Sequence, residues 1–140
     1  MQMLAHISED GARTQTIYEH LSGTAELAGA FAAPFGAQKE AAYAAQLHDI
    51  GKFSTWTIEP DTGRHRFIKH EDVGAKLAIP ILKKMCFSNK QIDYISYIIK
   101  KHMYPTAVVS APELNDKVMM RYVRKSADNA IDTIIIAKAD

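Results

Sequence analysis

Apolar residues recur at the spacing of an α-helix along almost all of the 140 residues of this chain. The clearest case is an isoleucine-rich stretch, whose start at Ser88 and Gln91 has the spacing of a capping box. Such patterns predict six helices, at about 14–33, 38–50, 71–85, 88–102, 113–125 and 129–140. Strands do not alternate with these helices, which excludes a parallel α/β sheet and favours an all-α fold.

Shorter signals fill the segments between these helices. Residues 55–58 favour a strand and 60–63 a turn, so a short hairpin or extended loop is expected around 55–68. Residues 1–12 are expected to be an irregular lead-in, and 104–112 a loop. Gly51 is predicted to be a C-cap glycine, and Pro80 to kink or split its helix. The length fits one domain over residues 1–140.

Composition narrows the classes of function. The net charge of +1 gives no bulk electrostatic reason to bind nucleic acid or a membrane, although a local basic patch is compatible with it. No apolar stretch approaches the roughly 20 residues of a membrane span, and the first residues do not resemble a signal peptide. The single cysteine, Cys86, excludes an internal disulfide, is expected to be a small buried residue, and fits a cytoplasmic setting.

The adjacent pair His48-Asp49 ends an alanine-rich helix and is followed by Gly51-Lys52. Burying a carboxylate at the end of an apolar helix is unfavourable unless a cation compensates its charge. A metal ion would supply that charge. Imidazole and carboxylate together suit iron, manganese, nickel or zinc, and the absence of cysteine ligands argues against a structural zinc site.

Four further side chains add to this pair. His20 lies in a predicted helix, among Ile17, Leu21 and Leu27, and is expected to face inward. His70 begins a helix, His102 ends one, and Asp140 ends an apolar run. Singly, each has an ordinary explanation: a core histidine, a residue next to an N-cap, or a solvated chain end. Together they favour a metal site where helix ends converge.

The pattern H…HD…H…H…D resembles the HD superfamily of metal-dependent phosphohydrolases, over about residues 15–140. The opening AHISEDGARTQTIYEHLSGTAELAGAFA looks like the start of the HD nuclease domain of type I CRISPR systems. The remainder, from LHDIGKFSTWTIEPDTGRHRFIKHEDVGAKLA onwards, is similar to the HD domain of bacterial tRNA nucleotidyltransferases. The resemblance implies a single HD-domain helical bundle of about six helices.

The resemblance also implies a site. It predicts that His20, His48, Asp49 and Asp140 hold a first divalent ion, and that Asp49 bridges to a second ion bound by His70 and His102. Asp49 and Lys52 are the predicted catalytic residues, with Lys52 on a substrate phosphate; its ordinary alternative is an exposed lysine at a helix end.

The implied reaction is hydrolysis of a phosphate ester by metal-activated hydroxide. The expected substrate is a nucleotide, which makes the chain a phosphomonoesterase, a nucleotidase or a cyclic phosphodiesterase of the phosphoester hydrolase class. Three alternatives stay open. They are a metal-dependent nuclease for single-stranded DNA, a di-iron oxygenase, and a non-catalytic nucleotide-binding module.

The chain departs from the family pattern at two places. Lys101-His102 stands where CRISPR-type nucleases carry two adjacent histidines, which weakens the second metal site and the nuclease interpretation. Asp140 is the last residue, so whether the chain is part of a longer protein is open, and Asp132 is a fallback ligand. The oligomeric state is open too.

Several other side chains receive a preferred and an alternative interpretation. His65 is expected to be exposed and is a weaker candidate for substrate contact. Trp56 and Tyr104 are expected to pack in the core, with base stacking as the alternative. A basic series is expected to be a solvated helix face, with a phosphate or nucleic-acid site as the alternative. It consists of Lys117, Arg121, Arg124 and Lys125.

Overall fold

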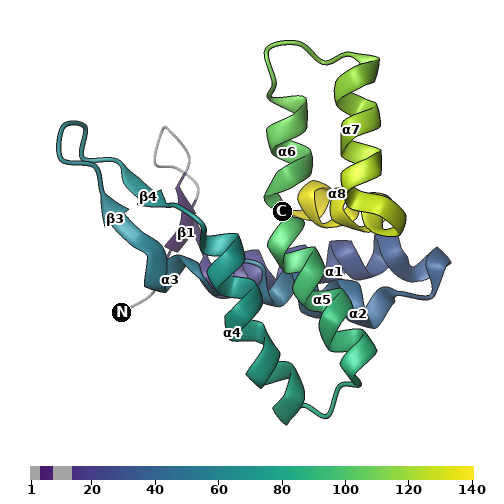
Figure 1. Cartoon of the computed structure of the whole chain (residues 1–140). Helices are drawn as coiled ribbons and strands as arrows, with labels where there is room; N and C mark the ends of the chain where they lie inside the picture. The colour runs from purple at the N-terminus through teal and green to yellow at the C-terminus, as the bar shows by residue number, and fades with distance from the viewer. Residues whose placement is uncertain (1–3, 8–13) are drawn as a thin grey trace.

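The computed structural model describes residues 4–7 and 14–140. Their elements follow one another as a helical bundle with two small hairpins (Figure 1). The strands are β1 Leu4–Ile7, β2 Thr14–Thr16, β3 Trp56–Ile58 and β4 His65–Phe67. The helices are α1 Ile17–Ala32, α2 Gln38–Leu47, α3 Lys52–Thr55, α4 His70–Lys84, α5 Asn89–Lys101, α6 Met103–Val109, α7 Asp116–Ser126 and α8 Ala130–Ala139, with 3₁₀ turns η1 Ala33–Phe35 and η2 Ala127–Asn129.

The predicted all-α fold is confirmed, and α1, α2, α4, α5, α7 and α8 correspond to the six predicted helices. The capping box at the start of α5 is also confirmed, because the Ser88 side chain accepts from the Gln91 N–H. The loop predicted over 104–112 is wrong, since α6 occupies most of it. Pro105 has no N–H to donate to the Lys101 carbonyl, so α5 ends at Lys101. Pro105 is tolerated in the first turn of a new helix, where the N–H groups have no partner within the helix.

One antiparallel hairpin precedes α1, and a second follows α3. β1 pairs with β2, so the irregular lead-in predicted for 1–12 is wrong at residues 4–7, and the rest of that lead-in lies outside the described residues. Thr16 ends β2 and caps α1, with Glu19 completing a capping box. β3 pairs with β4, with Trp56 opposite Phe67 and Ile58 opposite His65, which confirms the hairpin predicted around 55–68.

Small residues let the helices approach closely. Ala28 on α1 and Ala44 on α2 are fully buried, and α1 packs along α2, while α4 packs along α5. Ile95 and Ile98 of α5 fill the centre of the bundle. α8 runs across α1 and returns the chain end to the junction of α5 and α6 (Figure 1).

Some details of the predicted packing are wrong. α4 continues through the exposed Pro80 as one helix, so the predicted split does not occur. Ile17 and Leu27 are 36% and 48% exposed, and Cys86 is exposed rather than buried. Cys86 has a positive φ of 60° and lies in the turn that connects α4 to α5. Among the described helices, we find none of the length and apolar character that crossing a membrane requires.

Candidate metal centre

The six predicted ligands all lie in or near the terminal turns of helices. His20 is in the first turn of α1, and His70 is the first residue of α4. His48 and His102 are the C-caps of α2 and α5, and Asp140 is the C-cap of α8. Asp49 follows His48 in the turn that leads to α3. The fold thus brings together residues that are up to 120 positions apart in sequence.

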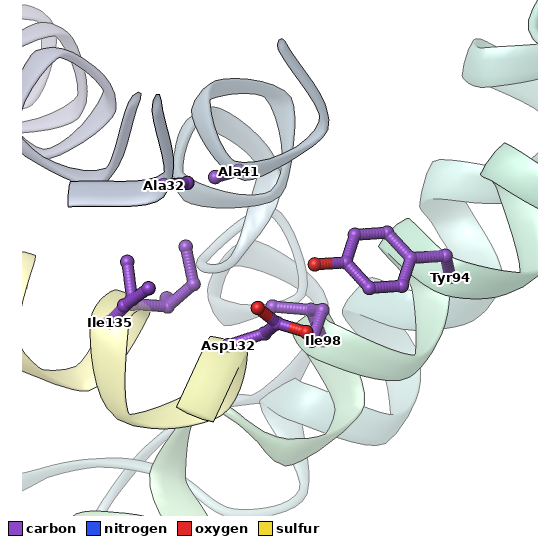
Figure 2. A pocket seen from close by; sticks show the side chains of 7 residues that line it. Ala32, Ala41, Tyr94, Ile98, Asp132 and Ile135 are labelled. Carbon is purple, nitrogen blue, oxygen red and sulfur yellow. The ribbon is translucent and has the colours of Figure 1, made fainter. Parts of the chain in front are cut away.

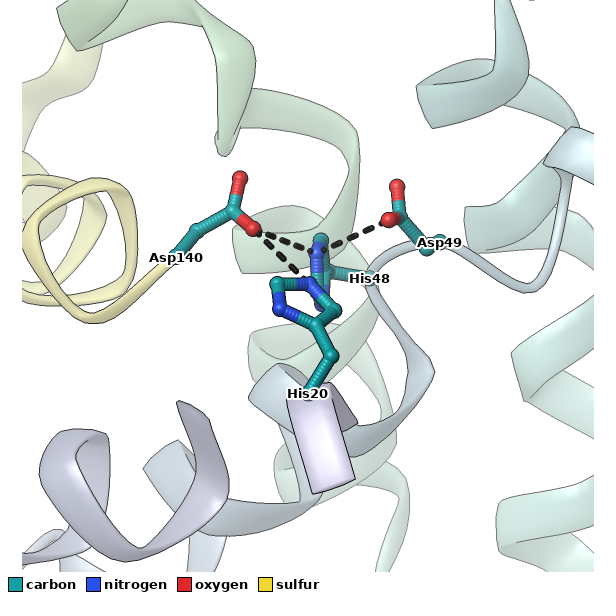
Figure 3. Close-up of side chains that lie close together, drawn as sticks. All are labelled: His20, His48, Asp49 and Asp140. Carbon is teal, nitrogen blue, oxygen red and sulfur yellow. Dashed lines mark ion pairs between the residues drawn. The ribbon is translucent and has the colours of Figure 1, made fainter. Parts of the chain in front are cut away.

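His20, His48, Asp49 and Asp140 form a first group (Figure 3). One carboxylate oxygen of Asp140 lies 3.2 Å from Nε2 of His20 and 3.2 Å from Nε2 of His48. The Asp49 Oδ2 atom is also 3.2 Å from Nε2 of His48. Each residue offers one ligand atom, and these atoms lie within 4.8 Å of one another.

Asp49, His70 and His102 form a second group. The other oxygen of Asp49, Oδ1, lies 3.4 Å from Nε2 of His70. Nε2 of His70 in turn lies 3.2 Å from Nε2 of His102. Asp49 therefore presents one oxygen to each group, which is the arrangement of a carboxylate that bridges two ions.

Backbone carbonyls fix the orientation of three of these imidazole rings. Nδ1 of His48 faces the Ala45 carbonyl, that of His70 faces the Phe67 carbonyl at 2.8 Å, and that of His102 faces the Ile99 carbonyl at 2.6 Å. A carbonyl can only accept, so each Nδ1 carries the hydrogen. Nε2 of a neutral ring then presents its lone pair to the cluster, as in metal-binding histidines.

This geometry fits metal ions better than it fits hydrogen bonds. Two neutral Nε2 lone pairs facing each other at 3.2 Å, as in His70 and His102, repel unless a cation or proton lies between them. Nε2 of His48 is fully buried, with a carboxylate oxygen of Asp49 and one of Asp140 each 3.2 Å away, so a proton or an ion is needed here too. With metal–ligand bonds of about 2.1 Å, neighbouring ligand atoms are expected about 3.0–3.4 Å apart, close to the observed spacing.

The electrostatics also favour positive charge at the first group. Burial alone would lower the pKa of His48, but the carboxylates of Asp140 and Asp49 raise it to about 10. Burial would raise the pKa of Asp49, and His48 and Lys52 instead hold it well below its usual range. Contact with His48 likewise lowers the pKa of Asp140. Without an ion, the two carboxylates therefore retain a proton on His48 that a metal would replace.

His102, in the second group, differs from His48. Burial lowers the pKa of His102 to about 4, so this ring is neutral at physiological pH and can act as a ligand without first losing a proton.

Lys52 lies at the edge of the centre. Its ammonium group donates to Oδ2 of Asp49, and its side chain is 40% exposed. It also lies 5.7 Å from the centre of the Phe67 ring. Lys52 is therefore close enough to both Asp49 and the solvent to meet a phosphate at the site, and its predicted catalytic role stays a prediction.

The structure requires glycine at position 51 for a different reason from the predicted one. Its φ of −74° is not left-handed, so it is not a C-cap glycine. A Cβ atom at Gly51 would lie 2.1 Å from the His70 carbonyl oxygen and 2.6 Å from the Gly74 nitrogen. Glycine at this position lets the turn that carries His48 and Asp49 touch the start of α4, which carries His70.

The fallback ligand Asp132 lies elsewhere. It lines a pocket between α1, α2, α5 and α8, where burial and the Asp132 charge raise the pKa of Tyr94 (Figure 2). Eight residues of helix, about 12 Å, separate it from Asp140. The structure therefore assigns Asp132 to the packing of α8 rather than to the ligand groups.

The secondary candidates are placed as follows. His65 is exposed, as predicted, and Trp56 is 53% exposed, so its predicted core packing is wrong. Tyr104 is half-buried against Tyr122. The basic series on α7 is exposed, as a solvated face requires.

Sequence reasoning missed the parts played by the Phe67 carbonyl and by Gly51. Two signals were available in the sequence. His70 follows Phe67 by three residues, and Gly51 follows the His48-Asp49 pair by two.

Comparisons with known proteins point to one family. The sequence profile of the HD domain family matches residues 17–140. The CC-adding tRNA nucleotidyltransferase of Thermus thermophilus is 31% identical over 101 residues, which cover 72% of this chain and 22% of that protein. The A-adding tRNA nucleotidyltransferase of Deinococcus radiodurans is 32% identical over 98 residues, which cover 70% of this chain and 21% of that protein.

This chain therefore spans about a fifth of the length of these relatives. No solved structure matches it significantly. The family profile spans all six predicted ligands, and HD domains typically bind divalent metals and hydrolyse phosphate bonds. On the helical fold, the matched range and the paired ligand groups, this chain belongs to the HD domain family.

Proposed function

We propose that residues 1–140 form one HD domain that hydrolyses a phosphate ester of a nucleotide. His20, His48, Asp49 and Asp140 would hold one divalent ion, and Asp49, His70 and His102 a second. The observation that carries this proposal is the close approach of His70 and His102, whose Nε2 atoms lie 3.2 Å apart while each Nδ1 faces a carbonyl. When bound, such ions neutralise phosphate charge and lower the pKa of water.

The protein's own groups would hold and orient the reacting phosphate. Lys52 extends from the edge of the centre and can donate to a non-bridging phosphate oxygen. A lysine in this place offsets the negative charge that develops as the phosphorus becomes five-coordinate. The burial of His48 and His102, at 0% and 2% exposure, excludes water from the inner side of the site. The phosphate would therefore approach from the side of Lys52.

The sharpest test is Asp49→Ala, because this side chain takes part in both ligand groups. We expect the variant to lose both ions and all phosphatase activity. Elemental analysis of the purified protein would measure the ions. A panel of nucleoside monophosphates, cyclic nucleotides and simple phosphate esters would measure turnover. Asp128→Ala is the matched control, because Asp128 is exposed in the turn η2 and belongs to neither group.

Activity that survives Asp49→Ala would exclude this mechanism. The same preparations separate the alternatives. Cleavage of single-stranded DNA with manganese or nickel would favour the nuclease, and a mixed-valence iron signal without phosphatase activity would favour the oxygenase. Nucleotide binding without retained metal would favour a regulatory module.

A further inference from the structure

The β3–β4 hairpin presents an exposed aromatic and apolar face beside the metal centre. Side chains directly opposite each other in an antiparallel pair lie on the same face, and alternate residues share a face. The register therefore gathers four residues on one side. They are Trp56, Ile58, His65 and Phe67. Trp56 and Ile58 are each 53% exposed, and we call this the hairpin face.

The opposite side of the hairpin is polar and internally paired. The side chain of Thr57 contacts the Arg66 backbone, and Arg66 forms an ion pair with Glu59 at 2.9 Å. The charges of that side therefore neutralise each other. The hairpin face carries no carboxylate, so it does not repel a negatively charged ligand.

The hairpin face is continuous with the metal centre through Phe67. The Phe67 carbonyl orients His70, and the Phe67 ring lies under the Lys52 ammonium group, which contacts Asp49. A phosphate that reaches Lys52 is therefore next to the first residue pair of the hairpin face, Trp56 and Phe67. The second pair, Ile58 and His65, lies about 7 Å further along the strands.

Trp56 is held in place although it is exposed. Its indole N–H donates to Nδ1 of His65 at 3.0 Å, and the two ring centres are 5.5 Å apart. An aromatic ring that is fixed before binding loses little conformational freedom when a ligand stacks on it. This hydrogen bond leaves much of the indole accessible.

We propose that the hairpin face binds the base of a mononucleotide whose phosphate lies at the metal centre, with Trp56 as the stacking residue. The inference rests on the proposed function, because it takes the metal centre as the phosphate site. Every nucleobase has a π-face, so stacking on Trp56 would favour nucleotides over other phosphate esters without selecting one base. The hairpin would then determine the substrate class, while the helices supply the metal ligands.

Trp56 is the only tryptophan of the chain, so its fluorescence reports on this residue alone. We expect AMP to quench this fluorescence in the zinc-loaded full chain, and ribose 5-phosphate, which lacks a base, to leave it unchanged. Unchanged fluorescence at AMP concentrations that saturate turnover would overturn the proposal. Quenching by a short single-stranded RNA but not by AMP would also overturn it, in favour of a polynucleotide.

Kinetics give an independent measurement. Trp56→Ala should lower kcat/KM for AMP by about 5- to 150-fold, which is the loss of affinity expected when one base no longer stacks on an aromatic ring. It should not change kcat/KM for ribose 5-phosphate, and Trp56→Phe should retain most of the activity on AMP. Phe35→Ala is the control, because Phe35 is also an exposed aromatic residue, at 65%, but lies in η1 after the far end of α1.

The two proposals fail in different ways. If both esters are hydrolysed equally well and Trp56→Ala changes neither rate, the hairpin proposal is wrong and the hydrolase stands. If AMP quenches Trp56 but no ester is hydrolysed, the base site stands and the proposed hydrolysis is wrong.

Discussion

Gly51 offers a direct test of how the two metal groups are held together. In Gly51→Ala, the new Cβ would lie 2.1 Å from the His70 carbonyl oxygen and 2.6 Å from the Gly74 nitrogen. Both are backbone atoms, so no side-chain rotation relieves the clash. Ordinary contact begins at 3.4 Å, and the turn and the start of α4 must separate by about 1.3 Å.

This displacement is large for the metal centre and moderate for the fold. Ligand distances tolerate about 0.2 Å, so moving His70 away from Asp49 should remove most of the affinity of the second group. Overpacking of this kind costs about 1–3 kcal/mol in the free energy of unfolding. For a chain of 140 residues, that loss corresponds to a fall in Tm of roughly 3–12 °C.

Thermal unfolding and titration with zinc or manganese would measure both effects. Gly23→Ala is the control, because Gly23 lies inside α1 and no atom outside its own helix turn lies within 4 Å of the place that a Cβ would take. That change should stabilise the protein, by up to about 1 kcal/mol, through helix propensity alone. If Gly51→Ala keeps both the wild-type Tm and the second ion, the proposed role of this close approach is wrong.

Three further predictions concern caps, packing and pH. Ser88→Ala removes the capping box of α5 and should lower stability by about 1 kcal/mol, measured by urea denaturation. Tyr122→Phe removes the hydroxyl that contacts Thr133 and the Ala130 carbonyl, each at 2.6 Å, and should lower stability by about 0.5–1.5 kcal/mol in the same assay. Because His48 has a pKa of about 10 without an ion, metal must displace its proton at neutral pH. Affinity at the first group should therefore rise with pH, with release of about one proton, which calorimetry in buffers of different ionisation enthalpy would detect.

The sequence was informative where local pattern decides the structure. Apolar periodicity located the six long helices, and the Ser88 capping box located the start of α5. The HD pattern selected six side chains that the fold gathers into two groups, although their role as ligands stays a prediction. Pattern succeeds here because a helix needs one apolar face along its whole length.

The sequence failed where distant contacts decide the structure. The pairing of β1 with β2 carries no strong local signal. The exposure of Trp56 depends on what covers the hairpin, and an aromatic residue in a short strand is as compatible with a core as with a surface. The glycine at 51 looked like a cap, because its close approach to His70 joins segments that only the fold brings together.

The position of the ligands at helix ends has a physical reason that goes beyond geometry. His48, His102 and Asp140 are the C-caps of α2, α5 and α8. Carbonyls in the last turn of a helix lack intrahelical donors, and those of Ala45 and Ile99 each face the Nδ1 of the histidine three residues later.

The same carbonyls give each helix a C-terminal charge equivalent to roughly −0.5. The C-terminal ends of α2, α5 and α8 meet the N-terminal ends of α1, α4 and α6 at the site, so their dipoles largely cancel. The carboxylates of Asp49 and Asp140 supply the negative charge that favours a cation there. A lysine or a proton could compensate this negative charge, but a single metal ion can bind the facing lone pairs of His70 and His102 and the carboxylate of Asp49 at the same time.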